Sequence, residues 1–172
     1  MPDKFLSHID TLLIKYKNKG IIIDSNLLIY YFIGSYHQNL VKNFKVTKKY
    51  GIDGYKIIRD ILNLFEYKIT TPNILTEISN LSNKIPDKEK IEFYHTFFQE
   101  ITIFDEVFIP SKEVFENEKS RKFGLTDSII FHLSKNKSYL VLTDDFELCK
   151  FLEFHNIDVL NYNNLFDILK VN

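Results

Sequence analysis

The chain has 172 residues, of which 45% are hydrophobic, and its 22 Lys and Arg nearly balance 23 Asp and Glu. This length suits one domain with a full core, and 16 Phe and 10 Tyr argue against a disordered chain. A net charge of -1 excludes a uniformly basic surface that coats nucleic acid. The single cysteine, Cys149, excludes an internal disulfide and a thiolate metal cage.

The N-terminal residues and the longest apolar run bear on localisation. Charged residues interrupt the apolar ones in Met1–Ile14, so this stretch has no signal-peptide core. Leu27–Ile33 is far shorter than the roughly 20 residues that a bilayer requires. We therefore expect a soluble cytoplasmic protein that does not enter a membrane.

Hydrophobic periodicity predicts helices that alternate with strands along the chain. In chain order we expect helix 5–16, strand 20–24, helices 27–33, 37–50 and 55–65, strand 68–71, helices 72–81 and 88–99, strand 100–109, helix 125–134, strand 138–143, helix 146–154, strand 157–160 and helix 164–169. Continuous β-branched runs such as Ile21–Ile23 are typical of strands covered on both faces. The alternation predicts one α/β domain over residues 1–172, a parallel sheet between two layers of helices.

Two stretches lie outside the simple alternation. Residues 1–19 are expected to form an additional N-terminal helix. Residues 34–66 are expected to form a helical insertion, in which a glycine-containing turn at Gly51–Gly54 separates two helices.

The common nucleotide and nucleophile signatures are missing from the sequence. It contains no G-x-G-x-x-G, no G-x-x-x-x-G-K-[ST] and no G-x-S-x-G, which removes support for kinases, dehydrogenases and serine hydrolases. The histidines are scattered without ligand spacing, which argues against a zinc site. They are His8, His37, His95, His132 and His155.

Four acidic residues occur where α/β proteins place their sites, beyond the carboxyl ends of strands or early in a helix. Asp24 directly ends the first strand, and Asp145 follows the last apolar strand residue, Leu142, by three positions. Glu77 is in the second turn of its helix, at the border of the buried stripe, and Asp127 is in the first turn of another.

Each acid alone has a structural interpretation, because Asp24 and Asp145 could cap helices and Asp127 could favour a helix N-terminus. Together, four carboxylates at one edge of a sheet would repel one another by roughly 3 kcal/mol per pair at about 5 Å. Such a cluster requires a cation. Oxygen ligands without Cys or His select Mg²⁺ or Mn²⁺, which can activate water for phosphoryl transfer.

Four segments, in family order, resemble the motifs of PIN domains. Asp24-Ser-Asn26 after its strand resembles the D-[ST]-N motif, and residues 69–78 resemble the second strand and acidic helix. Leu125-Thr-Asp127 resembles the third acidic motif, and Thr143-Asp-Asp145 resembles the fourth, T-x-D.

The resemblance implies a five-stranded sheet in the order 3-2-1-4-5 and a divalent-metal-dependent endoribonuclease, a hydrolase of phosphodiester bonds. It assigns metal binding and catalysis to four residues, Asp24, Glu77, Asp127 and Asp145. It gives a supporting role to Asn26 and Thr143. Similarity to VapC-type toxins further implies an RNA substrate, an antitoxin partner and a homodimer.

Asp144 beside Asp145 leaves the fourth ligand open. Side chains alternate faces along a strand, so Asp145 should share the side of Thr143. Asp144 should then cap the following helix or lie in solvent.

Two further sets have a functional and a structural interpretation. Basic residues before Asp127 are candidates for RNA phosphate contacts, although Lys-rich loops are mostly solvated. They are Lys119, Arg121 and Lys122. An aromatic run could stack bases, although at helical spacing it is more often core. It comprises Tyr30, Tyr31, Phe32 and Tyr36.

Two rival functions remain. A haloacid-dehalogenase-like phosphatase also has an Asp after its first strand, but it requires a second Asp where this chain has Asn26. A catalytically inactive PIN-like module that binds RNA or protein is the stronger rival, because a fold can persist without its chemistry.

Overall fold

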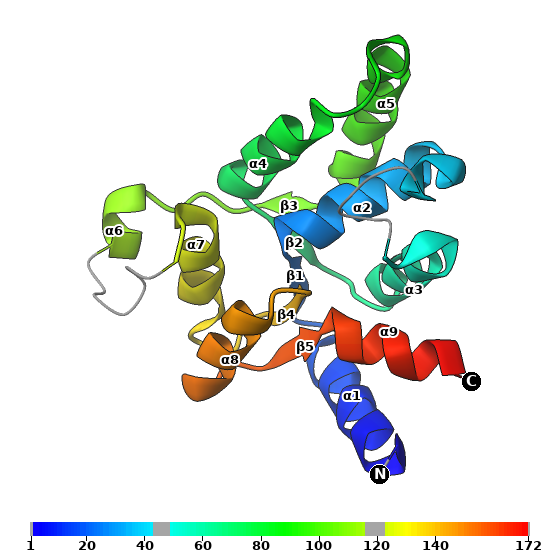
Figure 1. The fold of residues 1–172 in the computed structure, drawn as a ribbon. Coiled ribbons are helices and arrows are strands. Elements are labelled where there is room, and N and C mark those ends of the chain that lie inside the picture. The colour runs from blue at the N-terminus through cyan, green and yellow to red at the C-terminus, as the bar shows by residue number, and fades with distance from the viewer. Residues whose placement is uncertain (1, 43–48, 116–122, 172) are drawn as a thin grey trace.

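The computed structural model describes residues 2–42, 49–115 and 123–171. Its five parallel strands form one sheet in the order β3-β2-β1-β4-β5 (Figure 1). They are β1 (Ile21–Ile23), β2 (Lys68–Thr70), β3 (Asp105–Glu106), β4 (Leu140–Thr143) and β5 (Val159–Asn161). The predicted α/β fold and strand order are confirmed.

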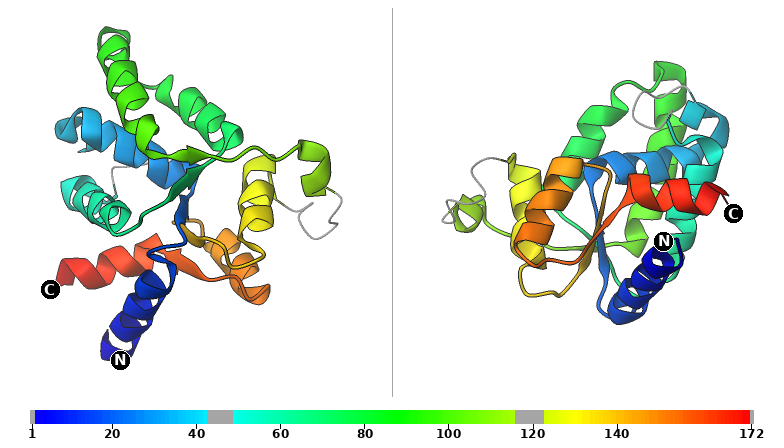
Figure 2. Two further views of the ribbon diagram at one scale, coloured as in Figure 1. Left: turned by 180° about the vertical axis from the view of Figure 1, so that it is seen from behind. Right: turned by 60° about the horizontal axis from the view of Figure 1, so that its bottom comes forward.

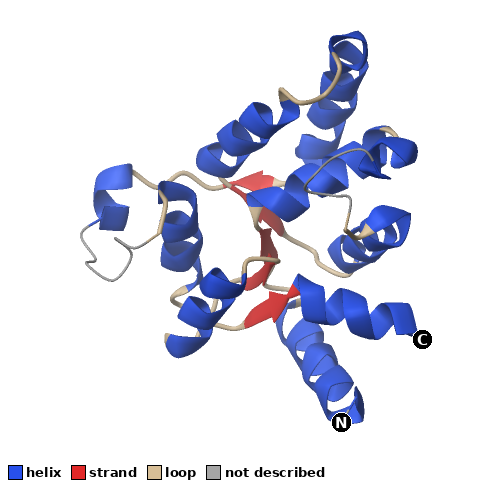
Figure 3. Ribbon diagram, in the orientation of Figure 1, coloured by secondary structure: helices blue, strands red, loops and turns tan. Residues whose placement is uncertain are grey.

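Helices cover both faces of the sheet. In Figures 1 and 3, α2, α3 and α9 lie on one side, and α7 and α8 lie on the other. The α-helices in the described part of the chain are α1 (Pro2–Tyr16), α2 (Ser25–Tyr36), α3 (Gly51–Asn63), α4 (Pro72–Ser82), α5 (Asp87–Glu100), α6 (Ser111–Phe115), α7 (Leu125–Ser134), α8 (Phe146–Phe154) and α9 (Tyr162–Val171). None of them is both long and apolar enough to span a bilayer.

The central strand β1 determines where a site can form. It pairs with β2 on one side and with β4 on the other, and its three isoleucines are fully buried. The chain leaves β1 toward β2 but leaves β4 toward β5, so the connections diverge at the carboxyl ends of β1 and β4. Such a switch point is where open α/β sheets bind ligands.

The N-terminal helix is joined to the sheet by a polar contact. The Asp158 carboxylate, just before β5, accepts hydrogen bonds from Tyr16 Oη at 2.8 Å and from Lys15 Nζ. Ile9 and Leu12 are buried in the same core as the strands. Figure 2 shows α1 near α9, and residues of both helices line one groove. Helix α1 thus packs on the same core as the sheet.

The helical insertion differs from the prediction. The expected helix 37–50 is represented by a short 3₁₀-helix, Gln38–Lys42, and residues 43–48 lie outside the described residues. The expected turn at Gly51–Gly54 is instead the first turn of α3. Close packing explains Gly54, because Tyr162 Oη donates to its carbonyl oxygen at 2.6 Å and a Cβ there would lie 2.5 Å from Tyr30 Oη.

The third strand is shorter than predicted. Only Asp105–Glu106 pairs with β2, and a 3₁₀-helix, Ile101–Ile103, precedes it. The partner strand limits the pairing, since β2 ends at Thr70 and α4 begins at Pro72, which has no N–H to donate. Helix α6 was not predicted.

The aromatic run belongs to the core. Tyr30, Tyr31 and Phe32 are buried, and Tyr36 is partly buried against the core. The core interpretation is therefore confirmed, and the base-stacking interpretation is wrong for the three buried rings.

Replacing Gly34 by alanine should destabilise the fold. A Cβ at Gly34 would lie 2.1 Å from Cδ2 of the Tyr55 ring, so α2 and α3 would have to shift. Overpacking costs about 1–3 kcal/mol, against a gain in helix propensity of about 1 kcal/mol. Thermal unfolding of Gly34→Ala should show a lower Tm. In a Tyr55→Ala background the loss should disappear, and an equal loss in both backgrounds would contradict this account.

Candidate functional site

Asp24 lies at the centre of the candidate site. It follows β1 directly, and its side chain is only 6% exposed. Although it occupies the N-cap position of α2, its side chain does not cap that helix. Its Oδ2 instead accepts a hydrogen bond of 2.7 Å from Thr143 Oγ1 on β4. The hydrogen bond expected from Thr143 is therefore present, and its support of a metal-binding acid stays a prediction.

Glu77 is joined to the same edge by Ser25. Ser25 Oγ donates to Glu77 Oε2 at 2.9 Å, which links α4 to the start of α2. Sequence reasoning missed Ser25, although it lies inside the D-[ST]-N motif, and selected Asn26 instead. The Asn26 side chain makes no hydrogen bond to any described residue, so its supporting role stays a prediction.

Asp145 has a structural role as a helix cap, while its predicted role in metal binding stays a prediction. It is the N-cap of α8, and its Oδ1 accepts hydrogen bonds from the backbone N–H groups of Glu147 at 2.8 Å and Leu148 at 3.0 Å. The expectation that Asp144 caps this helix or lies in solvent was wrong, because Asp145 is the cap and the Asp144 side chain is only 11% exposed. Asp145 can occupy the cap position because its own backbone N–H donates to Thr143 Oγ1 at 3.0 Å. This contact directs the Asp145 side chain toward the first turn of α8.

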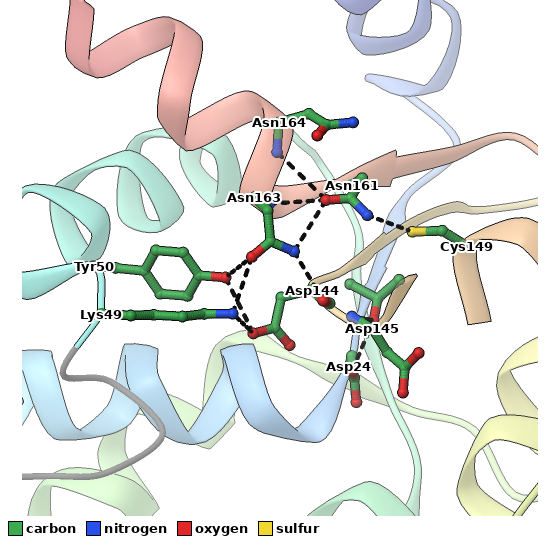
Figure 4. Close-up of polar contacts among 10 residues, drawn as sticks. Asp24, Lys49, Tyr50, Asp144, Asp145, Cys149, Asn161, Asn163 and Asn164 are labelled. Carbon is green, nitrogen blue, oxygen red and sulfur yellow. Dashed lines mark hydrogen bonds and ion pairs between the residues drawn. The ribbon is translucent and has the colours of Figure 1, made fainter. Parts of the chain in front are cut away.

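Asp144 lies within a separate polar network (Figure 4). Its Oδ2 is 2.9 Å from Lys49 Nζ and accepts a hydrogen bond of 3.1 Å from Tyr50 Oη. Asn163 Nδ2 donates to its backbone oxygen at 2.9 Å. Lys49 thus balances the charge of Asp144, which leaves Asp145 as the acid of this pair without a lysine partner among the described residues.

The environment of Asp24 disfavours its charge. Burial raises the pKa of Asp24 to about 7, against a smaller lowering by the hydrogen bond from Thr143. The negative charges of three nearby acids raise this pKa further: Asp127, Asp144 and Glu77.

Asp127, in the first turn of α7, behaves similarly. Burial raises the pKa of Asp127 to about 6, and the charges of Asp145 and Glu77 add to this effect. Neither carboxylate oxygen makes a hydrogen bond to a described residue. The structure thus brings all four predicted acids to one edge of the sheet, near enough to act on one another electrostatically.

Carboxylate oxygens suit a hard divalent cation such as Mg²⁺ or Mn²⁺. In Asp24, Glu77 and Asp145, one oxygen is held by hydrogen bonds and the other makes none to a described residue. Across residues 2–42, 49–115 and 123–171, no three His, Cys, Asp or Glu side chains already lie close enough to hold an ion together. The donor chemistry fits a cation, while the carboxylates are spaced more widely than a closed ligand set.

The candidate phosphate contacts, Lys119, Arg121 and Lys122, lie outside the described residues.

Comparisons with known proteins gave no further assignment. No family model matches the chain, and no significant match was found among curated proteins or solved structures.

Asp24→Asn should stabilise the metal-free protein at neutral pH. Between the ordinary Asp pKa of 3.8 and the folded value of about 7, the folded state holds more protons than the unfolded state. The free energy of unfolding therefore falls as pH rises through this window. The variant escapes this loss and still offers an oxygen to Thr143, so its advantage should grow from little near pH 4 to the order of 1–3 kcal/mol near pH 8.

Denaturant unfolding in EDTA at several pH values measures this difference. Asp167→Asn, which removes an exposed acid from α9, serves as the control. A variant at Asp24 that is less stable than the natural protein near pH 8 would show that Asp24 is a structural residue.

Proposed function

We propose that this protein is a Mg²⁺- or Mn²⁺-dependent endoribonuclease similar to PIN-domain nucleases. The observation that carries the proposal is the group of four acids at the switch point between β1 and β4, in which Asp24 and Asp127 have raised pKa values. Burial of the Asp24 and Asp127 charges near other acids is unfavourable unless a cation compensates them. Enzymes place strongly perturbed acids at functional sites.

The residues of the proposed site would have different roles in metal binding. Asp24 and Asp127 would provide the carboxylates that gain most from a cation, with Glu77 and Asp145 beside them. Thr143 and Ser25 orient Asp24 and Glu77 by holding one oxygen of each, as outer-shell partners do in metal sites. A bound Mg²⁺ or Mn²⁺ would supply an activated water and stabilise the charge that develops on the phosphate.

The proposal extends to a toxin of a toxin–antitoxin pair, on the strength of the sequence resemblance. Its partners would be RNA, an antitoxin protein and a second copy of the chain. Induced expression should stop bacterial growth, and co-expression of an adjacent small open reading frame should restore it. Normal growth during high expression of folded protein would contradict the toxin role.

A PIN-like module that binds RNA or protein without catalysis is the second candidate. The wide spacing of the carboxylates and the capping role of Asp145 favour it. Such a module would bind its partner equally well with and without a divalent ion.

Metal dependence should separate the two candidates. RNA cleavage should disappear in EDTA and return with Mn²⁺ or Mg²⁺. Mn²⁺ should also raise the Tm of the natural protein, because a ligand that binds only the folded state stabilises it. Asp24→Asn should lose both responses, while Asp167→Asn should keep both. Cleavage that persists in EDTA, or in Asp24→Asn, would exclude the proposed chemistry.

Substitutions at Asp145 should separate capping from catalysis. Asp145→Asn keeps a good N-cap but removes the charge, so it should lose metal-dependent cleavage with a stability change below about 0.5 kcal/mol. Asp145→Ala should lose cleavage and about 1 kcal/mol of stability. Asp144→Ala should keep most of the cleavage. Both properties can be measured on one RNA substrate and by thermal unfolding, and an inactive Asp144→Ala beside an active Asp145→Asn would reverse the assignment.

A further inference from the structure

A cleft of about 360 Å³ opens between α4 and the start of α7. The α4 wall carries Asn73, Glu77 and Asn80, whose spacing places them on one face of the helix. The α7 wall is formed by residues 124–127. Because Glu77 and Asp127 belong to the candidate site, the cleft is continuous with it. Its volume lies within the range of small-ligand sites.

Apart from these two acids, the polar side chains that line the cleft are neutral. The amides of Asn73 and Asn80 and the hydroxyl of Thr126 make no hydrogen bond to a described residue. An amide offers both donors and an acceptor, and a hydroxyl offers one of each. No Lys or Arg is among the described residues that line the cleft. The described lining suits a neutral ligand with adjacent donors and acceptors.

We propose that the cleft binds one unpaired nucleoside of the RNA, next to the phosphodiester bond that is cleaved. This inference rests on the proposed nuclease function. The edge of a nucleobase presents adjacent donors and acceptors, which an asparagine amide can match with two hydrogen bonds. Sequence-specific recognition of RNA mostly uses such contacts to unpaired bases. The position beside Glu77 and Asp127 makes the bound nucleoside a neighbour of the cleaved bond.

Two properties of the substrate follow. The enzyme should prefer one base beside the cleaved bond, because Asn73 and Asn80 distinguish donors from acceptors. It should also require that base to be unpaired, because pairing occupies the edge that the amides would bind. Annealing a complementary strand should therefore abolish cleavage at that bond.

Four single-stranded oligonucleotides that carry A, C, G or U beside a mapped cleavage site provide the test. For each, kcat/KM is measured with Mn²⁺, and Kd is measured in EDTA by fluorescence anisotropy. Asn73→Ala and Asn80→Ala should each lower kcat/KM and weaken Kd by roughly tenfold for the preferred base and change the others little. Asn83→Ala is the matched control, since this exposed asparagine at the end of α4 does not line the cleft.

The outcomes separate the cleft from the nuclease. If the natural protein cleaves RNA while both cleft variants keep its base preference and Kd, the nucleoside site is excluded and the nuclease stands. If the protein binds RNA with a base preference that Asn80→Ala removes, yet Mn²⁺ elicits no cleavage, the cleft is a base-binding site, but the nuclease and the position of that base beside a cleaved bond are excluded. Cleavage of the annealed duplex as fast as the single strand would overturn the cleft proposal, and absence of both binding and cleavage would overturn both.

Discussion

The central constraint in this protein is a buried carboxylate, Asp24, which directly follows the central strand β1. Because β1 is paired on both sides, the end of this strand is enclosed, and water cannot fully solvate the charge. The hydrogen bond from Thr143 compensates only part of this loss, so the pKa of Asp24 stays raised at about 7. An isolated acid would be a poor choice for such a position on grounds of stability alone. This cost is the physical reason to regard the edge as functional.

The other acids around Asp24 are satisfied to different degrees. The Lys49 ammonium balances Asp144, the N-terminal amides of α8 bind Asp145, and the Ser25 hydroxyl binds Glu77. Asp127 makes no hydrogen bond to a described residue, and burial raises its pKa to about 6. Asp24 and Asp127 are therefore the two acids whose negative charges are least compensated by the described residues. A cation between Asp24, which follows β1, and Asp127, in the helix before β4, would compensate both charges.

Most of the fold and the positions of the acids could be predicted from the sequence, because short local residue patterns indicate both. Buried runs such as Ile21–Ile23 identify strands without knowledge of their neighbours. The local signals failed where tertiary packing decides the outcome. Gly54 lies inside a helix, where a Cβ would come within 2.5–3.0 Å of three tyrosines. Likewise, the contact of Ser25 with Glu77 joins residues 52 positions apart, which no spacing rule could pair.

The most direct test of this account is calorimetry of Mn²⁺ binding in two buffers of different ionisation enthalpy. At about pH 6.5, Asp24 should be largely protonated and Asp127 partly so, and a bound cation must displace those protons. The account predicts that binding releases protons, so that the measured enthalpy differs between the buffers and the affinity increases toward pH 8. Absence of Mn²⁺ binding, or binding with the same enthalpy in both buffers, would contradict it.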